Sequence, residues 1–78
     1  MSEAAENLLG KIVALGEEYP ERWVPDDVLW PAANLSYEEY VDAAEELVVG
    51  GLAESKADGS DFPFLRATPD GAERVPPL

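Results

Sequence analysis

The chain lacks cysteine and histidine, and only five of its 78 residues are lysine or arginine. Without cysteine it can form neither disulfides nor thiolate metal sites. Without either residue it cannot build nucleophile–base pairs of the Ser-His or Cys-His kind. It also lacks a long apolar run, so we expect no segment to span a membrane. The N-terminal MSEAAEN has no apolar signal-peptide core. We therefore expect a non-catalytic, cytoplasmic protein with no metal and no cofactor.

Length predicts a single small domain over residues 1–78, with a core at the lower end of what folds unaided. A hydrophobic content of 46% is ordinary for a globular chain. The last residues, Val75-Pro76-Pro77-Leu78, cannot continue a helix because of their two prolines. We accordingly expect the folded core over about residues 3–75 and a flexible tail over 76–78.

Acidic residues are abundant, and 17 Asp and Glu leave a net charge of −12. Such a chain repels phosphate backbones and anionic membranes and attracts basic protein surfaces. A second explanation is that the chain comes from a halophile, whose proteins are acidic throughout and poor in lysine. Only Lys11 and Lys56 are present here. The sequence leaves both explanations open.

A helix is predicted from Ser36 to Gly51, with signals at both ends. Ser36 and Glu39 form the two halves of a capping box. Gly50 and Gly51 end the helix, because glycine readily adopts the left-handed conformation that closes a C-terminus. Apolar residues at helical spacing predict its buried stripe: Tyr37, Tyr40, Val41, Ala44, Leu47 and Val48.

The opposite face of this helix is acidic, with no basic residue between Ser36 and Gly51. A basic protein surface is therefore the partner that its charge fits. The residues predicted to form this protein-binding face are Glu38, Asp42, Glu45 and Glu46.

Two helices are expected before it. The first runs from about Glu3 to Leu15, with Ser2 as its cap. The second lies within Trp23–Trp30, with Pro25 at its first position. Pro31 disfavours helical geometry at the residue before it, so the second helix is expected to be about two turns long.

A β-hairpin is expected after the glycine pair, with strands over Leu52–Lys56 and Phe62–Ala67. Asp58-Gly59 between them is a hairpin turn signal. Pro63 requires that its strand has a free edge. Pro69-Asp70-Gly71, after Thr68, is expected to form a turn or a capped helical start. The fold class predicted is thus α+β, with three helices followed by a two-stranded hairpin.

This order resembles the winged helix-turn-helix domain of MarR- and PadR-like regulators. The residues that carry the resemblance are Val24-Pro25, Leu35-Ser36, Leu47, Gly51-Leu52 and Ala67-Thr68-Pro69-Asp70-Gly71, where Ala67 stands in place of the family's leucine. The resemblance covers roughly Leu8 to Val75. It implies that the third helix enters the major groove of DNA and that the hairpin, the wing, touches the DNA backbone or the minor groove.

Carried over to this chain, the resemblance places five residues of the helix against DNA: Glu38, Asp42, Glu45, Glu46 and Val49. The wing would add Lys56 and Arg66, beside acids. Phosphate binding needs several cations, and each acid near a phosphate costs on the order of 1 kcal/mol. Direct DNA binding is therefore disfavoured, though not excluded.

Aromatic residues divide between core and wing. We expect Trp23, Trp30, Tyr37 and Tyr40 to lie mostly in the core, because so small a domain needs their area. On the wing, Phe64 is expected as an exposed apolar contact beside the two bases. Phe62 either joins it or folds back onto the third helix.

Three hypotheses on function follow from these residues. The preferred one is an acidic winged-helix module that binds protein, as a transcription-associated adaptor or a DNA-mimicking regulator. The alternative is a DNA-binding regulator from a halophile. An enzyme is the least supported. The sequence carries no signal for the oligomeric state.

Overall fold

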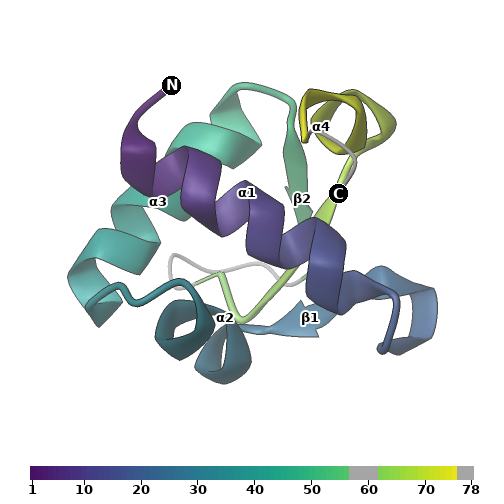
Figure 1. Ribbon diagram of the computed structural model, residues 1–78, viewed down its shortest axis with the longest axis horizontal. Helices are drawn as coiled ribbons and strands as arrows, with labels where there is room; N and C mark the ends of the chain where they lie inside the picture. Colours follow the sequence, from purple (N-terminus) through teal and green to yellow (C-terminus); the bar gives the residue numbers. More distant parts are fainter. Residues whose placement is uncertain (57–61, 76–78) are drawn as a thin grey trace.

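The structure, a computed structural model, describes residues 1–56 and 62–75 and has an α+β fold, as predicted (Figure 1). Four helices and a small antiparallel sheet make up these residues. In chain order the elements are α1 (Glu3–Gly16), the 3-10 turn η1 (Pro20–Arg22), β1 (Val24–Pro25), α2 (Asp26–Ala32), α3 (Tyr37–Val49), β2 (Ala53–Ser55), β3 (Phe64–Ala67) and α4 (Pro69–Arg74).

Capping residues set the starts of α1 and α3 as the sequence predicts. The Ser2 hydroxyl accepts a hydrogen bond from the Ala5 N–H at 3.1 Å. At α3, the Ser36 hydroxyl accepts from the Glu39 N–H at 3.2 Å, and the Ser36 N–H donates to the Glu39 carboxylate at 2.9 Å. Both halves of the capping box are therefore formed.

The start of α2 was predicted wrongly. The helix begins at Asp26, and Pro25 is its N-cap rather than its first residue. The residue before it, Val24, is fully buried and pairs with Leu65 as part of β1. Because Val24 is buried and paired in the sheet, the helix does not extend back to include it. Two paired residues are too short a strand to leave a period-two pattern in the sequence.

The end of α2 also differs from the prediction, since the helix continues through Pro31 to Ala32. Proline removes one helical hydrogen bond. Beyond it, the Ala33 N–H donates to the Leu29 carbonyl at 2.9 Å and closes the helix. Leu29 and Ala33 are both buried in the core. Their packing offsets the missing bond.

The sheet has three strands in the order β1-β3-β2, all antiparallel. The predicted pairing of β2 with β3 is present, but the expected two-stranded hairpin is wrong because β1 adds a third strand. The central strand is β3, so the free edge expected beside Pro63 is absent. Pro63 is tolerated because it lies one residue before β3, where its carbonyl accepts from the Asp26 N–H at 2.9 Å. The predicted turn at Asp58-Gly59 and the predicted tail at 76–78 lie outside the described residues.

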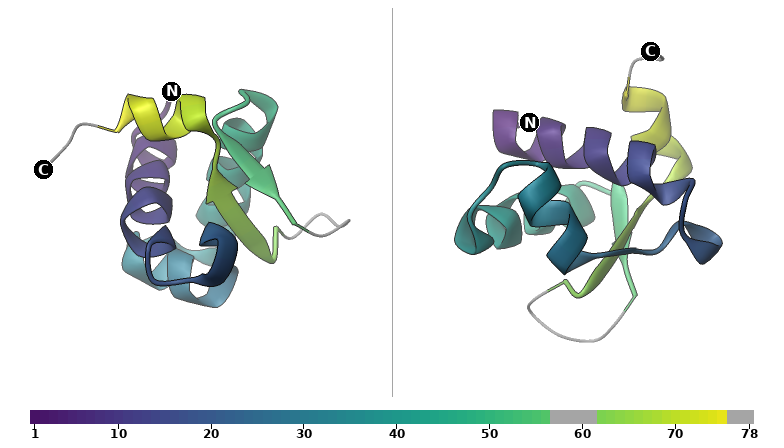
Figure 2. Two further views of the ribbon diagram at one scale, coloured as in Figure 1. Left: turned by 90° about the vertical axis from the view of Figure 1, so that its right-hand side faces the viewer. Right: turned by 60° about the horizontal axis from the view of Figure 1, so that its bottom comes forward.

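The core forms where α1, α2 and α3 gather on one side of the sheet, as Figure 2 shows. The fully or almost fully buried apolar residues are Ala5, Leu8, Leu9, Ile12, Val24, Leu29, Ala33, Tyr40, Ala43, Ala44, Leu47, Ala53 and Leu65.

After β3, residues 69–74 form a capped helix, the second of the two conformations expected for this segment. The Thr68 hydroxyl accepts a hydrogen bond from the Gly71 N–H and caps the helix.

Candidate functional site

The buried face of α3 is rotated relative to the predicted stripe. Ala43 is buried, although the sequence pattern left it out, whereas Tyr37 is 42% exposed and Val41 is half-buried. At 100° per residue the buried centre shifts by about 50°. Two apolar side chains assigned to the core thus lie at the edge of the solvent-facing surface. The α3 residues that are buried are Tyr40, Ala43, Ala44 and Leu47.

The acidic side of α3 faces solvent. We call the four predicted residues, Glu38, Asp42, Glu45 and Glu46, the α3 acidic face; all four are exposed. Within residues 1–56 and 62–75, the side chains of the first three make no ion pair or hydrogen bond. The Glu46 carboxylate accepts from the Ser2 N–H at 2.9 Å, and this bond holds the pKa of Glu46 below its usual value. The structure therefore brings the predicted residues onto one exposed surface.

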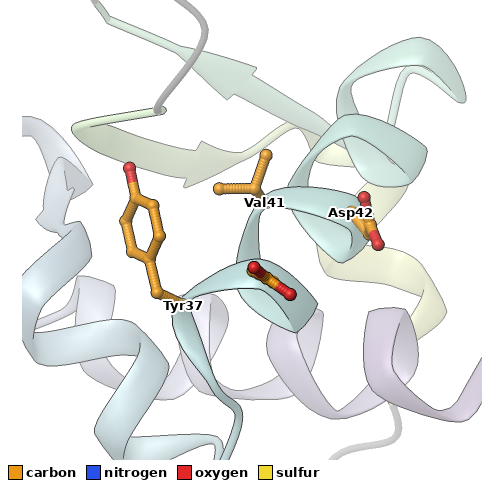
Figure 3. Close-up of a pocket in the computed structure, with 4 residues that line it drawn as sticks. Tyr37, Val41 and Asp42 are labelled. Atoms are coloured by element: carbon orange, nitrogen blue, oxygen red, sulfur yellow. The ribbon is translucent and has the colours of Figure 1, made fainter.

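Two shallow depressions of about 370 Å³ each lie along this surface and meet at Asp42. Figure 3 shows the first, where Tyr37 and Val41 project from successive turns of the helix. Val49, with 81% of its surface exposed, lies at the second. The first is lined by Tyr37, Glu38, Val41 and Asp42, and the second by Asp42, Glu45, Glu46, Val49 and Gly50.

The predicted wing contacts lie together on the open face of the sheet. Arg66 pairs with Glu54 across β2 and β3, its guanidinium 3.0 Å from the Glu54 carboxylate. The same guanidinium lies 4.4 Å from the centre of the Trp23 ring. Arg66 also donates to the Glu21 carbonyl at 3.4 Å. Its charge is thus held by an intramolecular ion pair and a cation–π contact.

Lys56 is the second cation beside the sheet, and it too lies against aromatic rings. Its Nζ is 5.2 Å from the centre of the Phe64 ring and 5.8 Å from that of Trp23. Phe64 is 36% exposed. We call Trp23, Glu54, Lys56, Phe64 and Arg66 the sheet cluster.

Sequence reasoning missed the part that Trp23 plays in the sheet cluster, because it placed this residue mostly in the core. Trp23 directly precedes β1, the strand that the sequence did not predict. The alternation about the buried Val24 would have turned Trp23 outward, but only once that strand was known.

Phe62 takes the second of its two expected positions, folded back toward α3. The Tyr40 hydroxyl donates to the Phe62 carbonyl at 2.7 Å, and the Phe62 side chain packs against the core. Phe62 has a left-handed backbone, with φ of 50°. Burial raises the pKa of the Tyr40 hydroxyl above its usual value.

Residues 1–56 and 62–75 hold no group of three or more acidic side chains placed to bind a metal ion, and no helix among them is long and apolar enough to cross a membrane. The surface features that remain are the α3 acidic face and the sheet cluster. In comparisons with known proteins, no family model, curated protein or solved structure matches this chain.

Proposed function

We propose that this chain is a non-catalytic, acidic winged-helix module that binds a basic protein surface through the α3 acidic face. Its role would be that of a transcription-associated adaptor or of a regulator that mimics DNA. The order of elements supports the winged-helix assignment, because three helices precede the β2–β3 hairpin. Ser36 opens the third of these helices within a few residues of the end of α2, which agrees with the tight turn on which the resemblance rests.

The observation that carries the proposal is the difference between the two charged surfaces. The α3 acidic face is exposed, while the cations of the wing have intramolecular contacts: Arg66 pairs with Glu54 and lies over the Trp23 ring, and the exposed Lys56 lies near the Phe64 ring. DNA binding releases counterions only when cations are free to contact phosphates. A duplex docked on α3 and the wing would thus meet exposed acids and an arginine that is already paired with Glu54. A basic protein surface meets complementary charge instead.

Binding titrations with charge-reversed variants test the proposal. The wild-type chain should bind a lysine- and arginine-rich peptide at about 150 mM salt and leave a short DNA duplex unbound. Asp42→Lys combined with Glu45→Lys should abolish peptide binding, because it reverses the charge at the middle of the α3 acidic face. Both side chains are exposed, so the fold should persist.

A matched control separates the α3 acidic face from net charge. Glu17→Lys combined with Glu18→Lys makes the same change in charge at exposed positions after α1, at the opposite end of the molecule from α3 (Figure 1). This variant should retain most of the peptide affinity. Equal losses in the two variants would mean that binding follows net charge and that α3 has no special role.

Titration with the DNA duplex should give the opposite result if the chain is instead a DNA-binding regulator from a halophile. Lys56→Gln removes an exposed base and leaves the Arg66 ion pair intact. Micromolar or tighter binding of the duplex by the wild type at about 150 mM salt, weakened by Lys56→Gln, would overturn the proposal.

A further inference from the structure

Exposed apolar side chains flank the α3 acidic face at its two ends. Val49 is 81% exposed at the C-terminal end, and Tyr37 is 42% exposed at the N-terminal end, next to the half-buried Val41. A single exposed valine is common on protein surfaces. Here each exposed apolar side chain lines one of the two depressions, and the acids lie between them.

We propose that α3 receives an amphipathic, cationic helix of a partner protein, with one apolar side chain seated in each depression. This inference rests on the proposed function and specifies the shape of the partner. Complementary charge favours lysine and arginine between the two apolar anchors. Packing of the anchors on Tyr37, Val41 and Val49 adds an attraction that salt does not screen.

The spacing of the acids favours a helix over an extended segment. Outward residues of α3 follow one another at positions 38, 42, 45 and 49, one on each turn. Successive turns are about 5.4 Å apart. A partner helix repeats its side chains at the same interval, whereas alternate residues of a strand are about 6.6 Å apart and fall out of step within a few residues.

The distance between the depressions sets the spacing of the anchors. Val41 and Val49 are eight residues apart in α3, so they lie about 12 Å apart along its axis. Two turns of a partner helix cover about 11 Å. The anchors should therefore lie two turns apart on one face, with basic residues on the turn between them.

Designed peptides test this geometry. The first is a lysine- and arginine-rich helix with two leucines two turns apart on one face. The second has the same composition, with one leucine moved to the opposite face. The first should bind the wild-type chain about tenfold more tightly, because only it can seat both anchors. It should also retain measurable affinity at about 1 M salt, where the Debye length is about 3 Å.

A variant of the protein completes the test. Val49→Ser removes the apolar surface at the second depression without altering charge, and because Val49 is exposed the fold should persist. It should weaken binding of the first peptide by about tenfold and reduce the difference in affinity between the two peptides. Ala14→Ser, at an exposed position of α1, is the matched control and should change neither affinity.

The outcomes distinguish this inference from the proposed function. If both peptides bind equally and salt abolishes both, the two-anchor geometry is wrong, while binding of basic proteins by α3 stands. If neither peptide binds and the DNA duplex does, both proposals are wrong. A preference for the first peptide that Val49→Ser removes supports both.

Discussion

At the scale of single residues, Tyr40 links the buried face of α3 to the segment that enters β3. Its ring is fully buried, and its hydroxyl donates to the Phe62 carbonyl at 2.7 Å. Phe62 needs such support, because its left-handed backbone is uncommon for a bulky residue. The Tyr40 hydroxyl thereby helps to hold the segment that leads into β3, the strand that carries Phe64 and Arg66 of the sheet cluster.

Tyr40→Phe should lower the free energy of unfolding by about 1–3 kcal/mol at neutral pH, since it leaves the Phe62 carbonyl without its donor. The raised pKa of Tyr40 also predicts a pH effect. Stability from its neutral form is complete below about pH 10, the value of an unfolded tyrosine, and is lost as the pH rises above it. Denaturant melts should therefore show the two proteins converging in alkali. A constant difference up to high pH would mean that Tyr40 ionises normally in the folded state.

Gly71 shows how closely α4 approaches the chain that follows α3. A Cβ built at this buried position would overlap the Leu52 carbonyl oxygen, a backbone atom that cannot rotate away. Gly71→Ala should therefore destabilise the fold by about 1–3 kcal/mol or more, as overpacking does.

Gly10 provides the opposite control for that substitution. It lies inside α1 with nothing within 4 Å of a Cβ, so Gly10→Ala should stabilise the protein by about 0.5–1 kcal/mol through helix propensity. Thermal melts of the two variants should shift in opposite directions. A neutral Gly71→Ala would show that α4 can move away from Leu52 at little cost.

At the scale of elements, local sequence signals predicted where helices begin and end better than they predicted which side of a helix is buried. The Ser2 cap of α1 and the capping box and glycine pair of α3 act within a few residues, so the sequence alone located them. The rotation of α3 depends on what packs against it, and nothing local distinguishes Ala43 from Tyr37. For the same reason β1 was missed: its two residues are strand only because Leu65 and Phe64 lie beside them. The acids of the α3 acidic face and the outward position of Val49 were predictable, while the partial exposure of Tyr37 and Val41 was not.

The capping box of α3 gives a prediction that depends on pH. The bond from the Ser36 N–H lowers the pKa of the Glu39 carboxyl. A depressed carboxyl pKa adds stability above the unfolded value, about 4.3, and that stability is lost as the pH falls through the folded pKa. Glu39→Gln keeps a neutral acceptor at this position. The wild type should therefore be more stable than Glu39→Gln at neutral pH, and the difference should disappear in acid.

Glu38→Gln is the matched control for this pH effect. It removes the same charge from the first turn of α3, where no capping bond engages the side chain within the described part of the chain. Its stability difference from the wild type should depend less on pH than that of Glu39→Gln. Identical profiles for the two variants would attribute the effect to general repulsion among acids rather than to the capping box.

At the scale of the whole molecule, the net charge of −12 acts over a small body. The described residues span 28 × 27 × 22 Å, and at about 0.01 M salt the Debye length is about 30 Å. In dilute buffer every acid therefore repels every other. Concentrated salt reduces this range to about 3 Å and leaves only contacts such as the Arg66–Glu54 ion pair.

Thermal melts across a potassium chloride series distinguish a general adaptation to salt from a local function. If the acidity is general, the chain should unfold at low temperature and without cooperativity in dilute buffer, and gain both stability and cooperativity in molar salt. The double variants Asp42→Lys/Glu45→Lys and Glu17→Lys/Glu18→Lys should then gain equally in dilute buffer, because the same charge is changed in each. If repulsion is concentrated along α3, where four acids share exposed positions, the α3 variant should gain more and show the smaller dependence on salt. A sharp transition in dilute buffer that added salt hardly changes would remove the halophilic explanation, and the α3 acidic face would then require a partner to explain it.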